Sequence, residues 1–103
     1  MTRRLIIQPL AEADTTQAAL WYADQRTGLG LEFLAEVDQS LERAVVTPRQ
    51  FSCLRRKPEV RRVLTNRFPY RIIFVLRPDA IVVFRVLHSA RHDQEWRKHV
   101  PKD

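Results

Sequence analysis

Three residues of the C-terminal half, Arg61, Arg71 and His88, have side chains that could together cleave RNA without a metal ion. Such a reaction needs a base for the ribose 2′-hydroxyl, fixed cations for the phosphate and an acid for the leaving oxygen. His88 could act as acid or base, and the two arginines could clamp the phosphate. Arg71 and His88 share one sheet face in the register expected across the turn Pro78-Asp79, and Arg61 joins them if it lies opposite Ile73. The pattern therefore allows a metal-free nuclease site.

The same residues also have simpler interpretations. Arg61 and Arg62 could be solvated or paired with Glu59. A histidine at a strand end, such as His88, is as often a hydrogen-bonding residue as a catalytic one. Trp96 is expected to fill a core or an interface rather than to stack on a base. These alternatives stay open at the level of the sequence.

Other site chemistries lack the necessary residues. Cys53 is the only cysteine, which excludes an internal disulfide and a multi-cysteine metal site. His88 and His92 are four residues apart, but an expected strand end and turn separate them, so we expect no metal pair. The sequence contains no glycine-rich phosphate loop and no nucleophile elbow. We therefore expect no cofactor and no metal.

Charge is unevenly distributed along the chain. Residues 1–48 carry four arginines against seven acidic residues, whereas residues 49–98 carry 13 lysines and arginines against four acidic residues. A strongly basic half predicts a polyanionic partner, either a nucleic acid or an acidic protein. The adjacent cations Arg55, Arg56 and Lys57 are the clearest candidates for that contact.

The length of 103 residues predicts one domain, residues 1–103, with one modest core. Because a chain this small buries a smaller share of its surface than larger domains do, a partner would add noticeably to its stability. The apolar run after Arg4 is too short for a signal peptide or a membrane span, so we expect a cytoplasmic protein with no membrane contact.

The N-terminal half is expected to form a strand and two antiparallel helices. A strand over Leu5–Gln8 should end where Pro9 starts a helix that runs to about Arg26, and the glycines after Thr27 predict a tight turn. The apolar positions of the first helix are Leu10, Ala13, Leu20 and Trp21. The second helix ends before Pro48. Its buried stripe should be Leu34, Val37, Leu41, Ala44 and Val45, with Glu32, Glu36, Asp38 and Glu42 largely off it.

The C-terminal half changes from a helical period to a period of two. Residues 48–59 are interpreted as a loop. Three antiparallel strands are expected over Val60–Leu64, Tyr70–Leu76 and Ile81–Leu87, followed by a short helix at about Asp93–His99. The predicted fold is therefore α+β: an N-terminal strand, a two-helix hairpin, a three-stranded meander and a short C-terminal helix.

Both faces of the predicted meander are apolar. One face holds Tyr70, Ile72, Phe74 and Leu76 with Ile81, Val83, Arg85 and Leu87, and should pack under the helices. The other face holds Arg71, Ile73 and Val75 with Val82, Phe84, Val86 and His88. Two helices can cover only one face, so the second face should be covered by the C-terminal segment or by a partner chain.

Several short phrases occur in a characteristic order along nearly the whole chain. They are Trp21-Tyr22, Gly28-Leu29-Gly30 before Phe33-Leu34, Pro48 followed by Phe51, Val60-Arg61-Arg62, Phe68-Pro69-Tyr70-Arg71, and His88 with Arg91 and Trp96. In these phrases and in element order the chain resembles the ParE/RelE toxin superfamily, and within it the ParE-like plasmid stabilisation toxins. The resemblance implies a compact toxin of a toxin-antitoxin system that a cognate antitoxin neutralises by wrapping a segment around it.

The two branches of the superfamily differ in their targets. RelE-like members cut mRNA in the ribosomal A site, whereas ParE-like members inhibit DNA gyrase and trap cleaved DNA. RelE-like members typically have lysines in the loop and strand and a terminal tyrosine; here the loop has two arginines and one lysine, and the terminal aromatic is Trp96, which has no phenolic proton. The resemblance therefore favours a gyrase inhibitor that is not an enzyme, with a metal-free, ribosome-dependent mRNA endoribonuclease as the alternative.

The expected partners are an acidic, ParD-like antitoxin and DNA gyrase or, in the alternative, the ribosome and mRNA. A plain nucleic-acid-binding module or an inactive relic is a third hypothesis. The candidate partner- or nucleic-acid-binding residues are Arg55, Arg56, Lys57, Arg62, Phe84, Arg91 and Trp96.

Overall fold

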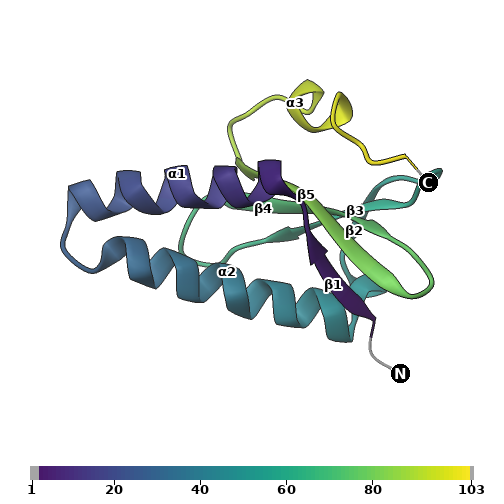
Figure 1. Cartoon of the computed structure of the whole chain (residues 1–103), viewed down its shortest axis with the longest axis horizontal. Helices are drawn as coiled ribbons and strands as arrows, with labels where there is room; N and C mark the ends of the chain where they lie inside the picture. Colours follow the sequence, from purple (N-terminus) through teal and green to yellow (C-terminus); the bar gives the residue numbers. More distant parts are fainter. Residues whose placement is uncertain (1–2, 103) are drawn as a thin grey trace.

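A computed structural model describes residues 3–102 and has the predicted α+β architecture (Figure 1). The predicted domain also includes residues 1, 2 and 103, which lie outside that range. The elements are β1 (Arg4–Ile7), α1 (Pro9–Gln25), α2 (Leu29–Val46), a 3-10 turn (Pro48–Gln50), β2 (Ser52–Arg55), β3 (Val60–Leu64), β4 (Tyr70–Leu76), β5 (Ala80–His88) and α3 (Gln94–Arg97). No helix within residues 3–102 has the length and apolar character needed to cross a membrane.

One five-stranded sheet, in the order β1-β5-β4-β3-β2, separates two apolar clusters. Strand β1 runs parallel to β5, and the other neighbours are antiparallel. The larger cluster lies between the sheet and the hairpin of α1 and α2 and includes Phe33, Val37, Ile72 and Phe74. The smaller cluster lies on the other face beneath α3, where Trp96 is buried. The C-terminal segment therefore covers the second sheet face, one of the two coverings that the sequence allowed.

Helix α1 packs through small residues, contrary to the predicted stripe. Ala11, Ala18 and Ala19 are buried. The two helices approach so closely that a Cβ added at Gly30 would lie 2.5 Å from the carbonyl oxygen of Ala19. Only small side chains fit such a contact, so the larger apolar residues of α1 point away from it. The predicted positions Leu10, Ala13, Leu20 and Trp21 are all exposed.

Helix α2 follows its predicted stripe in part, and Phe33 is buried where Leu34 was expected. Val37, Leu41 and Ala44 are buried as expected, whereas Leu34 is exposed. Glu36, predicted to lie off the stripe, is buried because its carboxylate accepts the backbone N–H of Arg67 at 2.9 Å and that of Phe68 at 3.4 Å. A buried carboxylate that accepts such bonds is satisfied, and it fixes the turn between β3 and β4 against α2.

The predicted loop over residues 48–59 is wrong in part, because Ser52–Arg55 forms β2. This strand pairs antiparallel with β3, Ser52 lying opposite Arg62 and Cys53 opposite Arg61. Its sequence, Ser-Cys-Leu-Arg, has neither β-branched nor aromatic residues, which are the usual indicators of a strand. The strand is therefore stabilised by its pairing with β3 and not by the strand propensity of its own residues.

A β-bulge in β5 changes the faces predicted for that strand. Near the turn the register is as expected, with Leu76 opposite Ile81 and Phe74 opposite Val83. Beyond it, Ile73 lies opposite Arg85, so Phe84 is the extra residue. One inserted residue moves every later side chain to the other face. Val86 therefore packs beneath the helices, and Leu87 packs beneath α3.

Candidate functional site

Arg71 is a buried structural cation on the α3 side of the sheet. Its side chain is 6% exposed; it donates to Asp93 Oδ1 at 2.7 Å and to the carbonyl oxygen of Arg91 at 2.9 Å. The hydrogen bond from Arg71 holds the pKa of the Asp93 carboxyl below its ordinary value of 3.8, and the charges of Arg71 and Arg97 act in the same direction. These contacts fasten the segment after β5 to the sheet.

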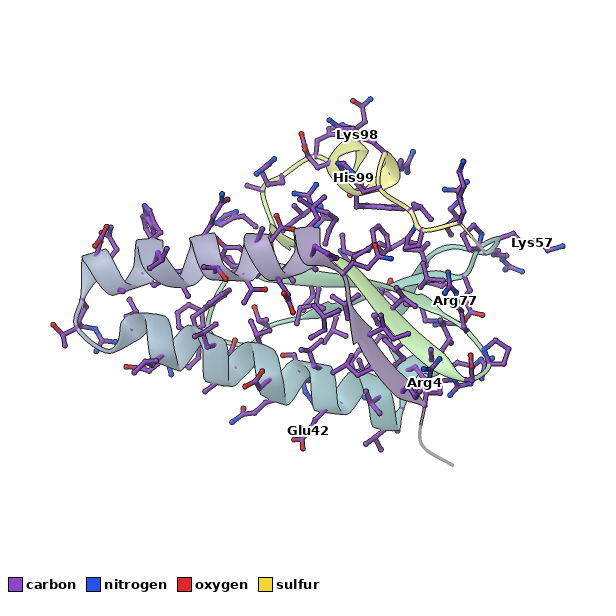
Figure 2. The ribbon with its side chains drawn as sticks, viewed as in Figure 1. Arg4, Glu42, Lys57, Arg77, Lys98 and His99 are labelled. Carbon is purple, nitrogen blue, oxygen red and sulfur yellow. The ribbon has the colours of Figure 1, made fainter. Side chains whose placement is uncertain are left out.

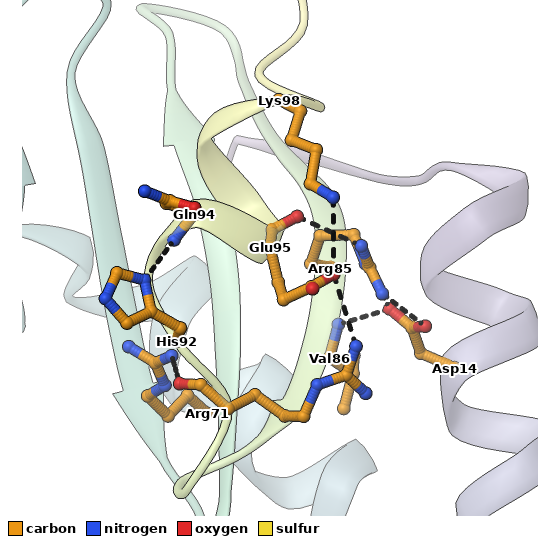
Figure 3. Close-up of polar contacts among 9 residues, drawn as sticks. Asp14, Arg71, Arg85, Val86, His92, Gln94, Glu95 and Lys98 are labelled. Carbon is orange, nitrogen blue, oxygen red and sulfur yellow. Dashed lines mark hydrogen bonds and ion pairs between the residues drawn. The ribbon is translucent and has the colours of Figure 1, made fainter.

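A second buried arginine, Arg85, connects three elements (Figure 3). Its Nε and one terminal nitrogen donate to the two carboxylate oxygens of Asp14 at 2.7 and 3.0 Å, and the other terminal nitrogen donates to the carbonyl oxygen of Glu95 at 3.1 Å. Asp14 also accepts the backbone N–H of Val86 at 3.0 Å. It therefore satisfies the edge of β5 beyond Val83, where pairing with β1 ends.

Sequence reasoning missed the pair of Arg85 and Asp14. The available signal was an arginine inside an apolar strand, because a buried cation requires a nearby carboxylate. The predicted register placed Arg85 beneath the helices, which concealed its contact with the α3 segment. The bulge at Phe84 is the physical reason for the difference.

His88 lies apart from Arg71. It is opposite Tyr70, and its ring packs edge-on against the Tyr70 ring with centroids 5.3 Å apart. Its Nδ1 accepts the backbone N–H of Ala90 at 3.0 Å. Because the bulge places Arg71 opposite Leu87, the two side chains belong to opposite faces of the sheet. The predicted grouping of Arg71 with His88 is therefore wrong.

Arg61 does not join either residue. It lies opposite Phe74 rather than Ile73. Its Nε donates to Glu59 Oε2 at 2.7 Å, and a terminal nitrogen donates to the carbonyl oxygens of Phe51 at 2.6 Å and Arg49 at 3.2 Å. The pairing with Glu59 is the simpler interpretation that the sequence allowed, and it is confirmed. The structure thus distributes the three candidate catalytic residues over separate sites.

Phe84 and Trp96 are core residues rather than surface contacts. Both are 1% exposed, and their ring centroids lie 6.4 Å apart in the cluster beneath α3. Almost none of either side chain is exposed to solvent. Trp96 is therefore the core residue that the sequence suggested, and the contact of these two aromatics with a partner stays a prediction.

The remaining cationic candidates gather on the hairpin of β2 and β3, residues 52–62, which we call the basic hairpin. Arg55, Arg56 and Lys57 are exposed at its turn, and Arg62 is half-buried. A hollow of about 450 Å³ on this hairpin is lined by Arg49, Cys53, Arg56, Glu59 and Arg61. Another, of about 370 Å³, is lined by Leu54, Arg55, Trp96 and Arg97. Arg91, by contrast, lies on the α3 segment and pairs with Glu95 at 3.2 Å.

Two apolar surfaces are exposed away from the basic hairpin. The α1 stripe, defined as Leu10, Ala13, Leu20 and Trp21, faces solvent, and Trp21 is 58% exposed. A hollow of about 360 Å³ between β1 and α2 is lined by Leu5, Ile7, Asp38, Leu41, Glu42, Val45 and Val46. Exposed apolar residues that lie close together are candidates for contact with a partner. Within residues 3–102 no group of three or more histidine, cysteine and acidic side chains is placed to hold a metal ion.

Comparison with known proteins agrees with this architecture. The family model described as ParE toxin of type II toxin-antitoxin system, parDE, matches residues 5–93. A solved structure described as the chromosomal ParDE TA system from P. aeruginosa is 18% identical and superposes with a TM-score of 0.70, covering 84% of this chain and 95% of that chain. A search of curated proteins gave no match. With the family model spanning most of its length, the chain belongs to the ParE toxins of type II toxin-antitoxin systems.

Proposed function

We propose that this ParE toxin inhibits DNA gyrase and that an acidic, ParD-like antitoxin neutralises it. The observation that carries the choice of target is the ion pair between the buried Arg71 and the partly exposed Asp93, with His88 on the other face of the sheet. Arg71 is thereby engaged within the protein and is separated from His88, which argues against a metal-free nuclease site that uses the two together. The surfaces that can act on another macromolecule are the basic hairpin and the exposed apolar residues.

The contacts of Arg71 and Arg61 support a binding mode of action. A phosphate would have to displace Asp93 from Arg71, or Glu59 and two carbonyl oxygens from Arg61. Each displacement would give up charge-assisted hydrogen bonds that the arginine already makes within the protein. A nuclease gains rate from cations that are already free to meet the developing charge, and these two are engaged.

Neutralisation by a protein partner is supported by the exposed apolar surface. The α1 stripe and the hollow between β1 and α2 leave large apolar side chains in water on a chain of 103 residues. A partner that covers such surface stabilises a small domain. The basic C-terminal half would attract an acidic antitoxin electrostatically before the apolar contacts form.

Two assays with purified toxin test the proposal. We expect the toxin to inhibit supercoiling by gyrase and to leave mRNA intact in a translating extract. Addition of the antitoxin encoded by the neighbouring reading frame should restore supercoiling. Cleavage of mRNA in the ribosomal A site, together with unaffected supercoiling, would show that the chain is the alternative endoribonuclease instead.

A further inference from the structure

The basic hairpin has more positive charge than its own contacts use. Residues 52–62 contain five cations, Arg55, Arg56, Lys57, Arg61 and Arg62, and one acidic residue, Glu59. That single carboxylate is already bound to Arg61 at 2.7 Å. Elsewhere in residues 3–102 exposed arginines such as Arg26 and Arg67 lie against a carboxylate, here that of Glu32. The hairpin is therefore built with cations directed to solvent.

The hairpin projects from the end of the molecule opposite the turn between α1 and α2. Figure 2 shows Lys57 at its tip, pointing away from the body of the protein. Strand β2 is the last strand of the sheet, so among the described residues one side of the hairpin has no neighbouring strand. Cationic hollows of about 450 and 370 Å³ involve Arg56 and Arg55, respectively. A long, charged ligand could thus approach the hairpin without obstruction from the helices.

The exposed side chains of the hairpin favour one class of polyanionic ligand over the others. Residues 52–62 expose no large apolar side chain, because Val60 is buried and Leu54 is half-buried. Protein interfaces need apolar or aromatic anchors at their centre, and here those anchors lie on other surfaces. Unpaired RNA or DNA is bound by stacking its bases on exposed aromatic rings. Two aromatic residues lie beside the hairpin, but Phe51 is half-buried and Trp96 is buried, so neither offers an open ring for stacking.

We propose that the basic hairpin is a binding site for the phosphate backbone of double-stranded DNA. Arginine supplies most of its charge, and the guanidinium fork donates two hydrogen bonds to one phosphate. Contacts of this type read no base sequence, and they fix a protein on the duplex. This proposal can be tested separately from the proposed inhibition of gyrase, because the hairpin should bind duplex DNA with no enzyme present.

Fluorescence anisotropy with a labelled duplex of about 20 base pairs tests the site directly. The variant Arg56→Ala/Lys57→Ala removes two exposed cations from the turn of the hairpin. The matched control, Arg26→Ala/Arg67→Ala, removes two exposed cations from the other end of the molecule. We expect the hairpin variant to lose about tenfold in affinity at about 100 mM salt, and the control about twofold or less. The slope of log affinity against log salt should become shallower by about 2 in the hairpin variant.

Three outcomes of this titration would overturn the proposal. One is no duplex binding by the unsubstituted toxin at about 50 mM salt, and another is an equal loss of affinity for the duplex in the two double variants. The third is tighter binding of a single-stranded RNA of the same length. A fourth would be displacement of the duplex by a glutamate-rich peptide at lower concentration than by unlabelled duplex, which would assign the hairpin to an acidic protein.

A second measurement does not depend on how the variants fold. Cys53 is the only cysteine, it is exposed, and it lines the hollow that contains Arg56 and Arg61. An environment-sensitive dye attached to this thiol should change its emission when duplex is added. An unchanged emission at saturating duplex would place the DNA elsewhere on the protein.

Discussion

At the scale of single residues, two buried arginines hold the C-terminal segment against the sheet. Arg85 binds Asp14 and the carbonyl oxygen of Glu95, and Arg71 binds Asp93. Both pairs lie at least partly out of water, where an ion pair is stable only if each charge keeps its partner. Each arginine therefore stabilises the fold as long as its carboxylate partner is present. Removal of either partner should lower the free energy of unfolding.

The pair of Asp14 and Arg85 gives the sharpest test at this scale. Asp14→Ala would leave Arg85 buried without a counter-charge and the N–H of Val86 without an acceptor. We expect the free energy of unfolding to fall by about 3 kcal/mol or more, measured by urea denaturation. The control is Asp79→Ala, which breaks the pair with Arg4 in which both side chains are more than 70% exposed; it should cost less than about 1 kcal/mol. Equal losses would contradict a structural role for Asp14.

The ion pair of Asp93 should make stability depend on acidity. Because the hydrogen bond from Arg71 lowers the pKa of Asp93 in the folded state, the pair stabilises the protein above the ordinary value of 3.8. That contribution is lost as the pH falls through the lowered pKa. Asp93→Asn should therefore melt at a lower temperature than the unsubstituted toxin at about pH 7, and the difference should shrink toward about pH 3. A difference that does not change with pH would contradict the assignment.

Among the helices and strands, the elements with large apolar side chains at regular spacing could be predicted from the sequence. The packing of α1, which depends on small side chains, could not. The stripe of α2 and the strands β3, β4 and β5 could be predicted from Val, Ile, Leu and Phe at regular spacing. The inward face of α1 could not, because its alanines carry little hydrophobic signal and its outward face carries Leu20 and Trp21.

The candidate site residues were grouped by an expected strand register. No local sequence pattern indicates the register that the structure has. The bulge at Phe84 contains no glycine to indicate it, and it moves Arg85 and His88 to the faces opposite those predicted. Contacts between neighbours in sequence, such as Arg61 with Glu59, were within reach of sequence reasoning. Contacts between Arg85 and Asp14, 71 residues apart, depend on packing that only the structure shows.

The two tryptophans provide a matched test of the element assignments. Trp96 is 1% exposed beneath α3 and Trp21 is 58% exposed on α1. Trp96→Ala should lower the free energy of unfolding by about 3–5 kcal/mol, because it empties the cluster that covers the second sheet face. Trp21→Ala should lower it by less than about 1 kcal/mol, as expected for a surface position. Chemical denaturation measures both; a larger loss for Trp21→Ala would reverse the assignment of core and surface.

At the scale of the whole molecule, apolar and cationic surfaces are separated. The acidic N-terminal half exposes the α1 stripe and the hollow beside β1, and the basic C-terminal half exposes the hairpin. An arrangement of this kind gives a small toxin two independent ways to engage a large assembly, one through protein and one through nucleic acid. Gyrase bound to DNA offers both, which is why the separation supports the proposed target.

Inhibition of gyrase by this toxin can be tested by measuring the cleaved DNA that gyrase accumulates on a plasmid in the presence of the toxin. If the toxin acts on gyrase, linearised plasmid should increase with toxin concentration while supercoiling declines, and toxin premixed with its antitoxin should have neither effect. Folded toxin in large excess that leaves both the supercoiling rate and the amount of linear plasmid unchanged would contradict the proposed inhibition of gyrase.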